Sequence, residues 1–288
     1  MKISCPRCTH LDSIKKDGHY FRAEDSHHIQ RYRCTHCGKR FSQATLSFEY
    51  RQKKRRINAP LLRLLCSKVS IRRAAILLNV DKNTVLKRFY YLSSKYAFLN
   101  EQYLKKFYQQ QAAVEIQFDD LITKEQTKLK PLSVTTVVDK KTRKIIGMRV
   151  SRIPAFGRLA EVGRKKYGKR QNEFAQNADE LFAQIKRFID KGAIIESDKS
   201  QFYPPLVNKH FPHATWHQYE GQKACVVGQG ELKKGGRDPL FQINHTLAML
   251  RDNISRLLRR SWCLSQKAEM LQMHLNCLQY FYNTRLVA

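Results

Sequence analysis

The chain has 288 residues, a length that suits two or three folded units, and 42% of them are hydrophobic. That share can supply a sizeable core, which excludes a disordered or fibrous protein. Lys and Arg number 54 against 24 Asp and Glu, which leaves a net charge of +30. Such a charge repels itself unless a polyanion balances it, and nucleic acid is the polyanion we expect.

The charge is concentrated in the first part of the chain. Residues 1–112 carry 24 Lys and Arg against 7 Asp and Glu (+17), and residues 113–288 carry 30 against 17 (+13). This distribution predicts a DNA-docking region followed by a domain with another role. No apolar run approaches the roughly 18–20 residues of a membrane span, and the first residues lack the apolar stretch of a signal peptide. We therefore expect a cytoplasmic protein with no membrane partner.

Four of the eight cysteines form two C-x-x-C pairs, C-P-R-C and C-T-H-C, made by Cys5, Cys8, Cys34 and Cys37. Each pair can fold into a tight turn, and two such turns complete a tetrahedral zinc site. Residues 19–22 and 29–33 have strand-like composition between the pairs, so the spacing predicts a zinc ribbon. Four protein ligands leave no open position on the metal, so the zinc is structural.

Further histidines and cysteines occur besides these four. The nearby histidines are alternative ligands: His10, His27, His28 and His36. The remaining cysteines are interpreted as small buried hydrophobic residues: Cys66, Cys225, Cys263 and Cys277.

A second DNA-facing module is predicted after the ribbon. Alanines at 74 and 75 let another helix cross closely, Asn79 and Val80 form a turn, and Asp81 can cap a helix over residues 82–93. This pattern indicates a helix-turn-helix, with an ordinary helical hairpin as the alternative. In the first interpretation, five side chains face outward toward DNA: Lys82, Asn83, Thr84, Lys87 and Arg88.

From residue 113 the pattern becomes one of strands followed by helices. Three strands of an antiparallel meander are predicted at residues 114–122, 132–138 and 144–150. A basic stretch rich in Gly and Lys (152–170) precedes a helix over 177–191 that Gly192 ends. Two further strands (193–196, 213–219) and two amphipathic helices (239–260, 266–282) follow. This order is that of an RNase H-like fold, whose first and fourth strands lie side by side.

Carboxylates stand at the ends of these two strands. Asp119 and Asp120 end the first strand, and Asp198 follows the fourth. Two-metal phosphodiester cleavage needs carboxylates that share ions about 3.5–4 Å apart, and Mg²⁺ prefers oxygen ligands. We therefore predict that Asp119 or Asp120, together with Asp198, binds catalytic Mg²⁺ or Mn²⁺. The alternative is that these are surface residues that cap loops.

Together these motifs resemble bacterial insertion-sequence transposases of the RNase H-like DDE superfamily, in the short-element class that begins with a zinc ribbon. The resemblance rests on C-P-R-C with C-T-H-C-G, Q-F-D-D-L, S-D-K-S and N-H-T-L-A-M-L-R-D-N-I-S-R-L-L-R-R-S-W, and it covers essentially the whole chain. Residues 241–262 are its most specific part. It implies DNA cleavage at element ends and strand transfer by the freed 3′-OH, with Asp119 as the first catalytic carboxylate and Asp198 as the second.

The resemblance also implies an α+β multidomain protein. Its parts are a zinc ribbon (1–48), a helix-turn-helix region (57–110), and an RNase H-like α/β catalytic core with C-terminal helices (113–288). The partners implied are double-stranded DNA, at element ends and target, and further copies of the chain in a dimer or higher oligomer. A bacterial, nucleoid-associated location follows from these partners.

The third catalytic position departs from the family pattern. Such enzymes usually place a Glu on the helix after the fifth strand, and alignment through L-R-x-x-I-x-R-L puts Asn244 there. An Asn can donate its carbonyl oxygen to Mg²⁺, but it lacks the charge and binds the metal more weakly. Glu231 and Asp252 are the alternatives, and Arg251 and Arg256 are predicted to contact DNA phosphates. A non-catalytic DNA-binding protein, either a regulator or a decayed transposase, is the alternative function.

Overall fold

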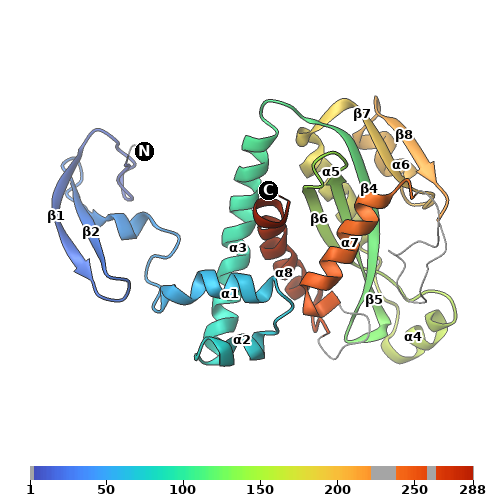
Figure 1. Ribbon diagram of the computed structural model, residues 1–288, viewed down its shortest axis with the longest axis horizontal. Coiled ribbons are helices and arrows are strands. Elements are labelled where there is room, and N and C mark those ends of the chain that lie inside the picture. The colour runs from blue at the N-terminus through green and yellow to red at the C-terminus, as the bar shows by residue number, and fades with distance from the viewer. Residues whose placement is uncertain (1–2, 222–237, 258–263, 288) are drawn as a thin grey trace. The chain divides into compact units, whose positions relative to one another are not determined.

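A computed structural model describes residues 3–221, 238–257 and 264–287. The chain divides into two compact units, Met1–Leu61 and Leu62–Ala288. The first contains a three-strand sheet and the second a five-strand mixed sheet with helices on its faces (Figure 1). The protein is therefore of mixed α+β class, as predicted.

The first unit is built on an antiparallel sheet. Its strands, in spatial order, are β1 (Ile14–Arg22), β2 (His27–Cys34) and β3 (Arg40–Ser42). Tyr32 and Phe41 pair across β2 and β3 and are buried, which gives this small sheet an apolar face. The strands predicted at residues 19–22 and 29–33 are confirmed, and the first begins earlier than predicted.

Three helices follow: α1 (Asn58–Leu65), α2 (Ile71–Leu77) and α3 (Lys82–Phe107). The side chain of Asp81 accepts a hydrogen bond from the Asn83 N–H at 2.7 Å, so the predicted cap is confirmed. Asn79, in the predicted turn, has a positive φ of 49°. The prediction that this helix ends near residue 93 is wrong. A buried stripe continues through Tyr96, Asn100 and Leu104 at four-residue intervals, which keeps the chain helical to Phe107.

The second unit is organised by its five-strand sheet. β4 (Ala113–Glu125), β5 (Thr127–Asp139) and β6 (Ile145–Arg152) form the predicted antiparallel meander. β7 (Ile189–Asp198) pairs in parallel with β4, and β8 (Thr215–Tyr219) in parallel with β7, which gives the order β6-β5-β4-β7-β8. The predicted adjacency of the first and fourth strands is confirmed.

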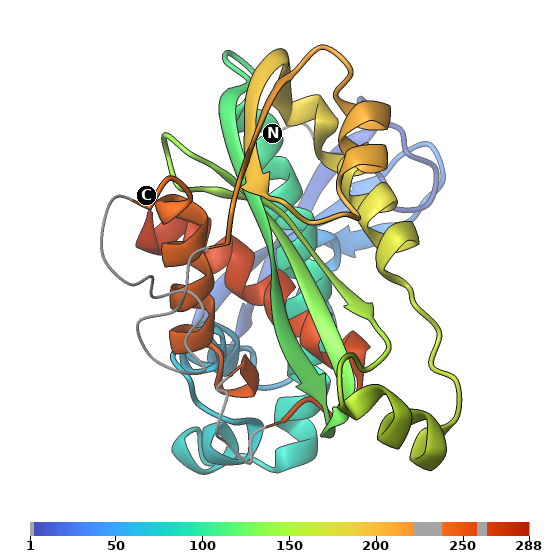
Figure 2. The same ribbon diagram turned by 90° about the vertical axis from the view of Figure 1, so that its right-hand side faces the viewer.

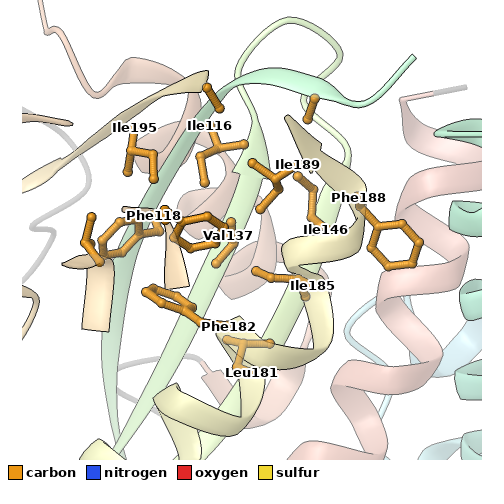
Figure 3. Packing of buried hydrophobic residues seen from close by; sticks show 14 of the residues in the cluster. Ile116, Phe118, Val137, Ile146, Leu181, Phe182, Ile185, Phe188, Ile189 and Ile195 are labelled. Atoms are coloured by element: carbon orange, nitrogen blue, oxygen red, sulfur yellow. The ribbon is translucent and has the colours of Figure 1, made fainter. Parts of the chain in front are cut away.

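Helices cover both faces of this sheet (Figure 2). α5 (Phe174–Ile185) and α6 (Pro204–His210) lie on one face, where Phe118 of β4 packs edge-on against Phe182 (Figure 3). α5 approaches so closely that a Cβ added at Gly147 would lie 2.7 Å from Cδ1 of Leu181. α7 (Phe241–Asn253) lies on the other face, and α8 (Ala268–Phe281) packs against β6 and α3.

In the second unit one helix was not predicted and two predicted helix ends are wrong. The basic stretch over residues 152–170 contains a helix, α4 (Leu159–Tyr167), which buries only Gly163. Gly192 does not end a helix: α5 stops at Ile185, and Gly192 lies in an irregular part of β7, where its N–H bonds to the Asp190 side chain at 2.8 Å. α7 ends at Asn253 because the buried Ile254 adopts an extended conformation.

Short helical turns complete the fold. The 3₁₀ turns are Gln43–Leu46 (η1), Arg55–Ile57 (η2), Lys186–Phe188 (η3) and Ser255–Leu257 (η4), and a π-helical turn spans Tyr282–Leu286 (η5). Among the described residues, no helix combines the length and the apolarity needed to cross a membrane.

Candidate functional site

The four cysteines of the two C-x-x-C pairs converge at one point. Their sulfur atoms all lie within 4.8 Å of one another, with Cys5 to Cys37 and Cys8 to Cys34 each at 3.6 Å. A tetrahedral ion with metal–sulfur bonds of about 2.3 Å separates its ligand atoms by roughly 3.8 Å. The cluster can therefore hold a metal ion, and its all-sulfur donor set and geometry fit zinc.

Tight turns bring these cysteines together. Gly38 N–H bonds back to the Cys34 carbonyl at 2.9 Å, and the φ of Gly38 is +70°, a region that favours glycine. Thr9 N–H makes the corresponding bond to Cys5 at 2.9 Å. Burial opposes ionisation of the Cys5 thiol, but the N–H groups of Cys8 and Arg7 outweigh it and lower its pKa to about 6. The pKa of Cys8 moves the other way: a backbone hydrogen bond at His10 lowers it, but burial and hydrogen bonds with the other three cysteines raise it to about 12.

The histidines named as alternative ligands divide into two groups. His10 and His36 stack with ring centroids 3.9 Å apart, and their nitrogens lie within 4.8 Å of the Cys8 sulfur. His27 begins β2, and the neighbouring His28 packs against His19. Of the scattered cysteines, Cys66 and Cys277 are buried, as interpreted from the sequence. Cys225 and Cys263 lie outside the described residues.

The carboxylates of the second unit lie just beyond the last paired residues of β4 and β7. Gln117 of β4 is in register with Glu196 of β7, and its Nε2 donates to a Glu196 carboxylate oxygen at 2.7 Å. Two residues further along the strands come Asp119 and Asp198, on the face that carries Gln117 and Glu196. Both are half-buried. One backbone N–H is bonded to each carboxylate, from Asp120 at 2.7 Å and from Ser200 at 3.2 Å.

The negative charges of these carboxylates affect the pKa of a neighbouring tyrosine. The pKa of Tyr203 is raised well above its ordinary value, chiefly by burial and then by the negative charges of Asp120, Asp119 and Asp198. All three carboxylates therefore act on one phenol, which places them in the same part of the fold.

Asp120 differs from Asp119 because it points to the opposite face of the sheet. Its Oδ1 accepts hydrogen bonds from Ser133 at 2.7 Å and Thr135 at 2.6 Å, and its Oδ2 accepts one from Tyr203 at 2.7 Å. Burial raises the pKa of Asp120, and these three hydroxyl donors oppose the increase. Asp120 is thus engaged in the packing of α6 against the sheet, and Asp119 is the one that shares a face with Glu196.

Gln117 also anchors the helix that carries Asn244. Its Oε1 accepts the Ile243 N–H at 3.0 Å, and its Nε2 donates to the Pro239 carbonyl at 2.8 Å. Asn244 is only 3% exposed, and its Nδ2 donates to Oδ2 of Asp238 at 2.7 Å. Among the described residues, no donor bonds to the Asn244 side-chain oxygen.

Sequence reasoning missed Gln117, Glu196 and Asp238. Gln117 occupies a polar position of an alternating strand and Glu196 directly follows the apolar run 193–195, so the sequence pattern marks neither as part of a buried network. Glu196 also accepts from Lys140 Nζ at 3.0 Å and from the Tyr219 hydroxyl at 3.3 Å. Lys140, Glu196, Tyr219, Asp238 and Phe241 are among the residues that line a cavity of about 480 Å³ beside this network.

Asp119 and Asp198 on the sheet and Asn244 on α7 each carry an oxygen atom of the kind that Mg²⁺ and Mn²⁺ prefer as a ligand. The alternative third ligand Asp252 is exposed on α7, and its carboxylate pairs with Lys68 at 2.5 Å. Glu231, the other alternative, lies outside the described residues.

The residues predicted to contact DNA have different surroundings. Lys82, Asn83 and Lys87 are exposed on the first turns of α3, while Thr84 and Arg88 are half-buried. The guanidinium of Arg251 bonds to the carbonyls of Leu257 and Ile122, each at 3.1 Å. Arg256 lies over the Phe89 ring, 5.9 Å from its centroid. Both arginines are therefore engaged within the fold.

Comparison with known proteins adds no identification. No family model matches the chain, and no curated protein matches its sequence.

Proposed function

We propose that this chain is a DNA transposase with an RNase H-like catalytic core. The observation that carries the proposal is the position of Asp119 and Asp198 on one face of two adjacent, parallel central strands. The strand order β6-β5-β4-β7-β8, in which β5 runs antiparallel to the other four strands, supports the RNase H-like assignment. α7 covers the same face and brings Asn244 with it.

In this proposal the chain's own oxygen atoms hold the catalytic metal. The carboxylates of Asp119 and Asp198 and the amide oxygen of Asn244 are the ligands for Mg²⁺ or Mn²⁺. When bound, such ions activate the attacking water or 3′-hydroxyl and stabilise the leaving oxygen. Gln117 and Glu196 fix the register of the two strands and the start of α7, so the three ligands are held before DNA arrives.

Several exposed surfaces support DNA as the substrate. The exposed cations at the start of α3 follow a short helix and a tight turn, the geometry of a helix-turn-helix. α4 presents Arg164, Lys165 and Lys166 to solvent, and the whole chain carries +30. The cysteine cluster then holds structural zinc in a ribbon that contributes to recognition of the element ends. Pairing of two ends requires at least two copies of the chain.

One observation favours a second candidate, a non-catalytic DNA-binding protein. An amide at position 244 supplies no negative charge where a carboxylate is usual, which weakens metal binding. Both candidates bind DNA in a salt-sensitive way, so cleavage is the property that separates them.

The test uses the purified full chain on labelled DNA that carries the roughly 50 base pairs flanking its gene, with Mg²⁺ or Mn²⁺. We expect metal-dependent nicking at the element end that is lost in Asp198→Ala and reduced in Asn244→Ala. Asp252→Ala is the matched control, since it removes an exposed carboxylate from α7 and should nick like wild type. Binding without nicking by the wild-type protein would overturn the transposase proposal and favour the second candidate.

A further inference from the structure

Asp238 and Asn244 form a side-chain pair at the start of α7. The Asn244 Nδ2 donates to Oδ2 of Asp238 at 2.7 Å, and the other carboxylate oxygen, Oδ1, accepts the Leu240 N–H at 3.0 Å. Asn244 is buried and Asp238 is half-buried. Because each oxygen of Asp238 has its own donor, the orientation of this carboxylate is set by the fold.

The hydrogen bond to Asp238 fixes which atom of the Asn244 amide, the oxygen or the nitrogen, faces away from Asp238. An asparagine side chain can turn either its oxygen or its nitrogen toward a neighbour. A carboxylate only accepts hydrogen bonds, so Asp238 engages Nδ2 and directs the Asn244 oxygen away from itself. A hard divalent cation binds the amide oxygen and not the nitrogen. The pair thus selects the amide orientation that a metal site needs.

The surrounding structure holds both partners in place. Gln117, in the centre of β4, bonds to the Pro239 carbonyl and to the Ile243 N–H. These two groups belong to the residue directly after Asp238 and the residue directly before Asn244. A buried strand residue therefore fixes the chain at both ends of the pair.

We propose that Asp238 is a positioning residue that orients the Asn244 amide oxygen toward the site formed by Asp119 and Asp198. This inference rests on the proposed function. Carboxylates that hydrogen-bond a metal ligand orient it and tune its affinity. Asp238 keeps a negative charge next to position 244, which compensates in part for the usual Glu. The pair also accounts for the amide itself, because a carboxylate at 244 would face Asp238 with like charge and no donor.

The first test is a charge-swap cycle on the metal-free protein, followed by thermal unfolding. We expect Asn244→Asp to lower Tm by roughly 3–8 °C, because a buried hydrogen bond is replaced by repulsion. Adding Asp238→Asn should restore Tm to within about 2 °C. The asparagine introduced at 238 keeps an oxygen for the Leu240 N–H and offers its NH₂ to the carboxylate at 244. Asp252→Asn, on the exposed side of the same helix, removes only a surface ion pair with Lys68 and should lower Tm by less than about 2 °C.

The second test titrates the same proteins with Mn²⁺, followed by electron paramagnetic resonance. Asp238→Asn alone should weaken Mn²⁺ binding about tenfold, because the amide is no longer oriented. The double swap should bind Mn²⁺ about tenfold more tightly than wild type, since a carboxylate replaces the amide as ligand.

The two readouts separate failure of this inference from failure of the proposed function. A double swap no more stable than Asn244→Asp, or Asp238→Asn with wild-type Mn²⁺ affinity, would overturn the role of Asp238 alone. A wild-type protein that binds no Mn²⁺ would overturn the metal site itself, and the positioning role with it.

Discussion

The hydroxyl of Tyr203 donates a hydrogen bond to Oδ2 of Asp120 at 2.7 Å, which ties the chain at the start of α6 to the centre of β4. Tyr203 is almost fully buried, and its ring packs edge-on against Phe118. The bond thus joins a polar group on the central strand to the apolar core that α5 and α6 form on that face.

We expect Tyr203→Phe to destabilise the protein by about 1–2 kcal/mol, because the Asp120 carboxylate loses one of its three donors without losing burial. The loss of a donor should also raise the pKa of Asp120 further. Urea unfolding at pH 7 measures the first effect. Tyr167→Phe, at an exposed tyrosine of α4, is the control that should change stability little. Equal stabilities of the two variants would contradict this account.

Removal of zinc should unfold the first unit and leave the second intact. The three-strand sheet buries few side chains besides Tyr32 and Phe41, so the cysteine cluster is expected to supply much of its stability. Hydrogen exchange after chelation should show lost protection in β1 and β2 and retained protection in β4. Cys34→Ser should abolish the one zinc per chain that elemental analysis is expected to find, and Cys66→Ala should retain it. Unchanged protection in β2 without metal would refute the structural role.

The close approach of α5 to β6 makes Gly147 sensitive to substitution. A Cβ there would lie 2.7 Å from Leu181 Cδ1 and 2.8 Å from Ile185 Cγ2, inside normal contact distance. Gly147→Ala should therefore cost roughly 1–3 kcal/mol by overpacking. Gly192→Ala is a matched control in β7, because its Cβ would meet only the Asp190 carboxylate at 3.6 Å. Chemical denaturation of both variants checks the prediction, and a Gly147→Ala protein as stable as Gly192→Ala would contradict it.

Local patterns predicted the elements better than their lengths and partners. Asp81 was recognisable as a cap because its cause is local, a carboxylate beside the free N–H groups of the next turn. The end of α3 was not, because Asn100 in its buried stripe is polar. Its side chain is accommodated by a hydrogen bond from Asn283, 183 residues away. α4 was missed because it is short and rich in basic residues, and because its apolar side chains Leu159, Val162 and Tyr167 stay exposed instead of joining the core.

In the candidate site too, the residues with a local signal could be predicted and the residues that act through distant partners could not. Asp198 ends β7 as predicted, but the prediction that Asp119 ends its strand is wrong, because β4 continues to Glu125. Both carboxylates could still be proposed because they follow apolar strand residues, and their catalytic roles stay predictions. The residues that connect them could not be proposed, because each acts through a distant partner. Gln117 meets Glu196 from 79 residues away and Ile243 from 126 residues away. Such pairs depend on strand register and on the packing of α7, which no local pattern encodes.

The buried His274 should make stability depend on pH between about 4 and 6.5. Burial is the main cause that lowers its pKa to about 4, and the positive charge of Arg256 adds to the effect. Its Nε2 lies 2.8 Å from the Leu65 carbonyl and donates to it, while Nδ1 is buried with no partner among the described residues. A proton on Nδ1 would therefore have no acceptor, so the folded state keeps the ring neutral.

Because the folded pKa lies below the unfolded value near 6.5, the unfolded state binds the extra proton first as the pH falls. The contribution of His274 is full above about pH 6.5 and is lost progressively down to about pH 4, a loss of about 3 kcal/mol. His274→Gln keeps a donor for the Leu65 carbonyl and does not titrate. The difference in unfolding free energy between wild type and His274→Gln should therefore shift by about 3 kcal/mol against wild type from pH 7 to pH 4. Urea titrations at both pH values measure this difference, in which other titrating groups cancel. A difference that does not change with pH would show that His274 carries a proton in the folded state as readily as in the unfolded chain.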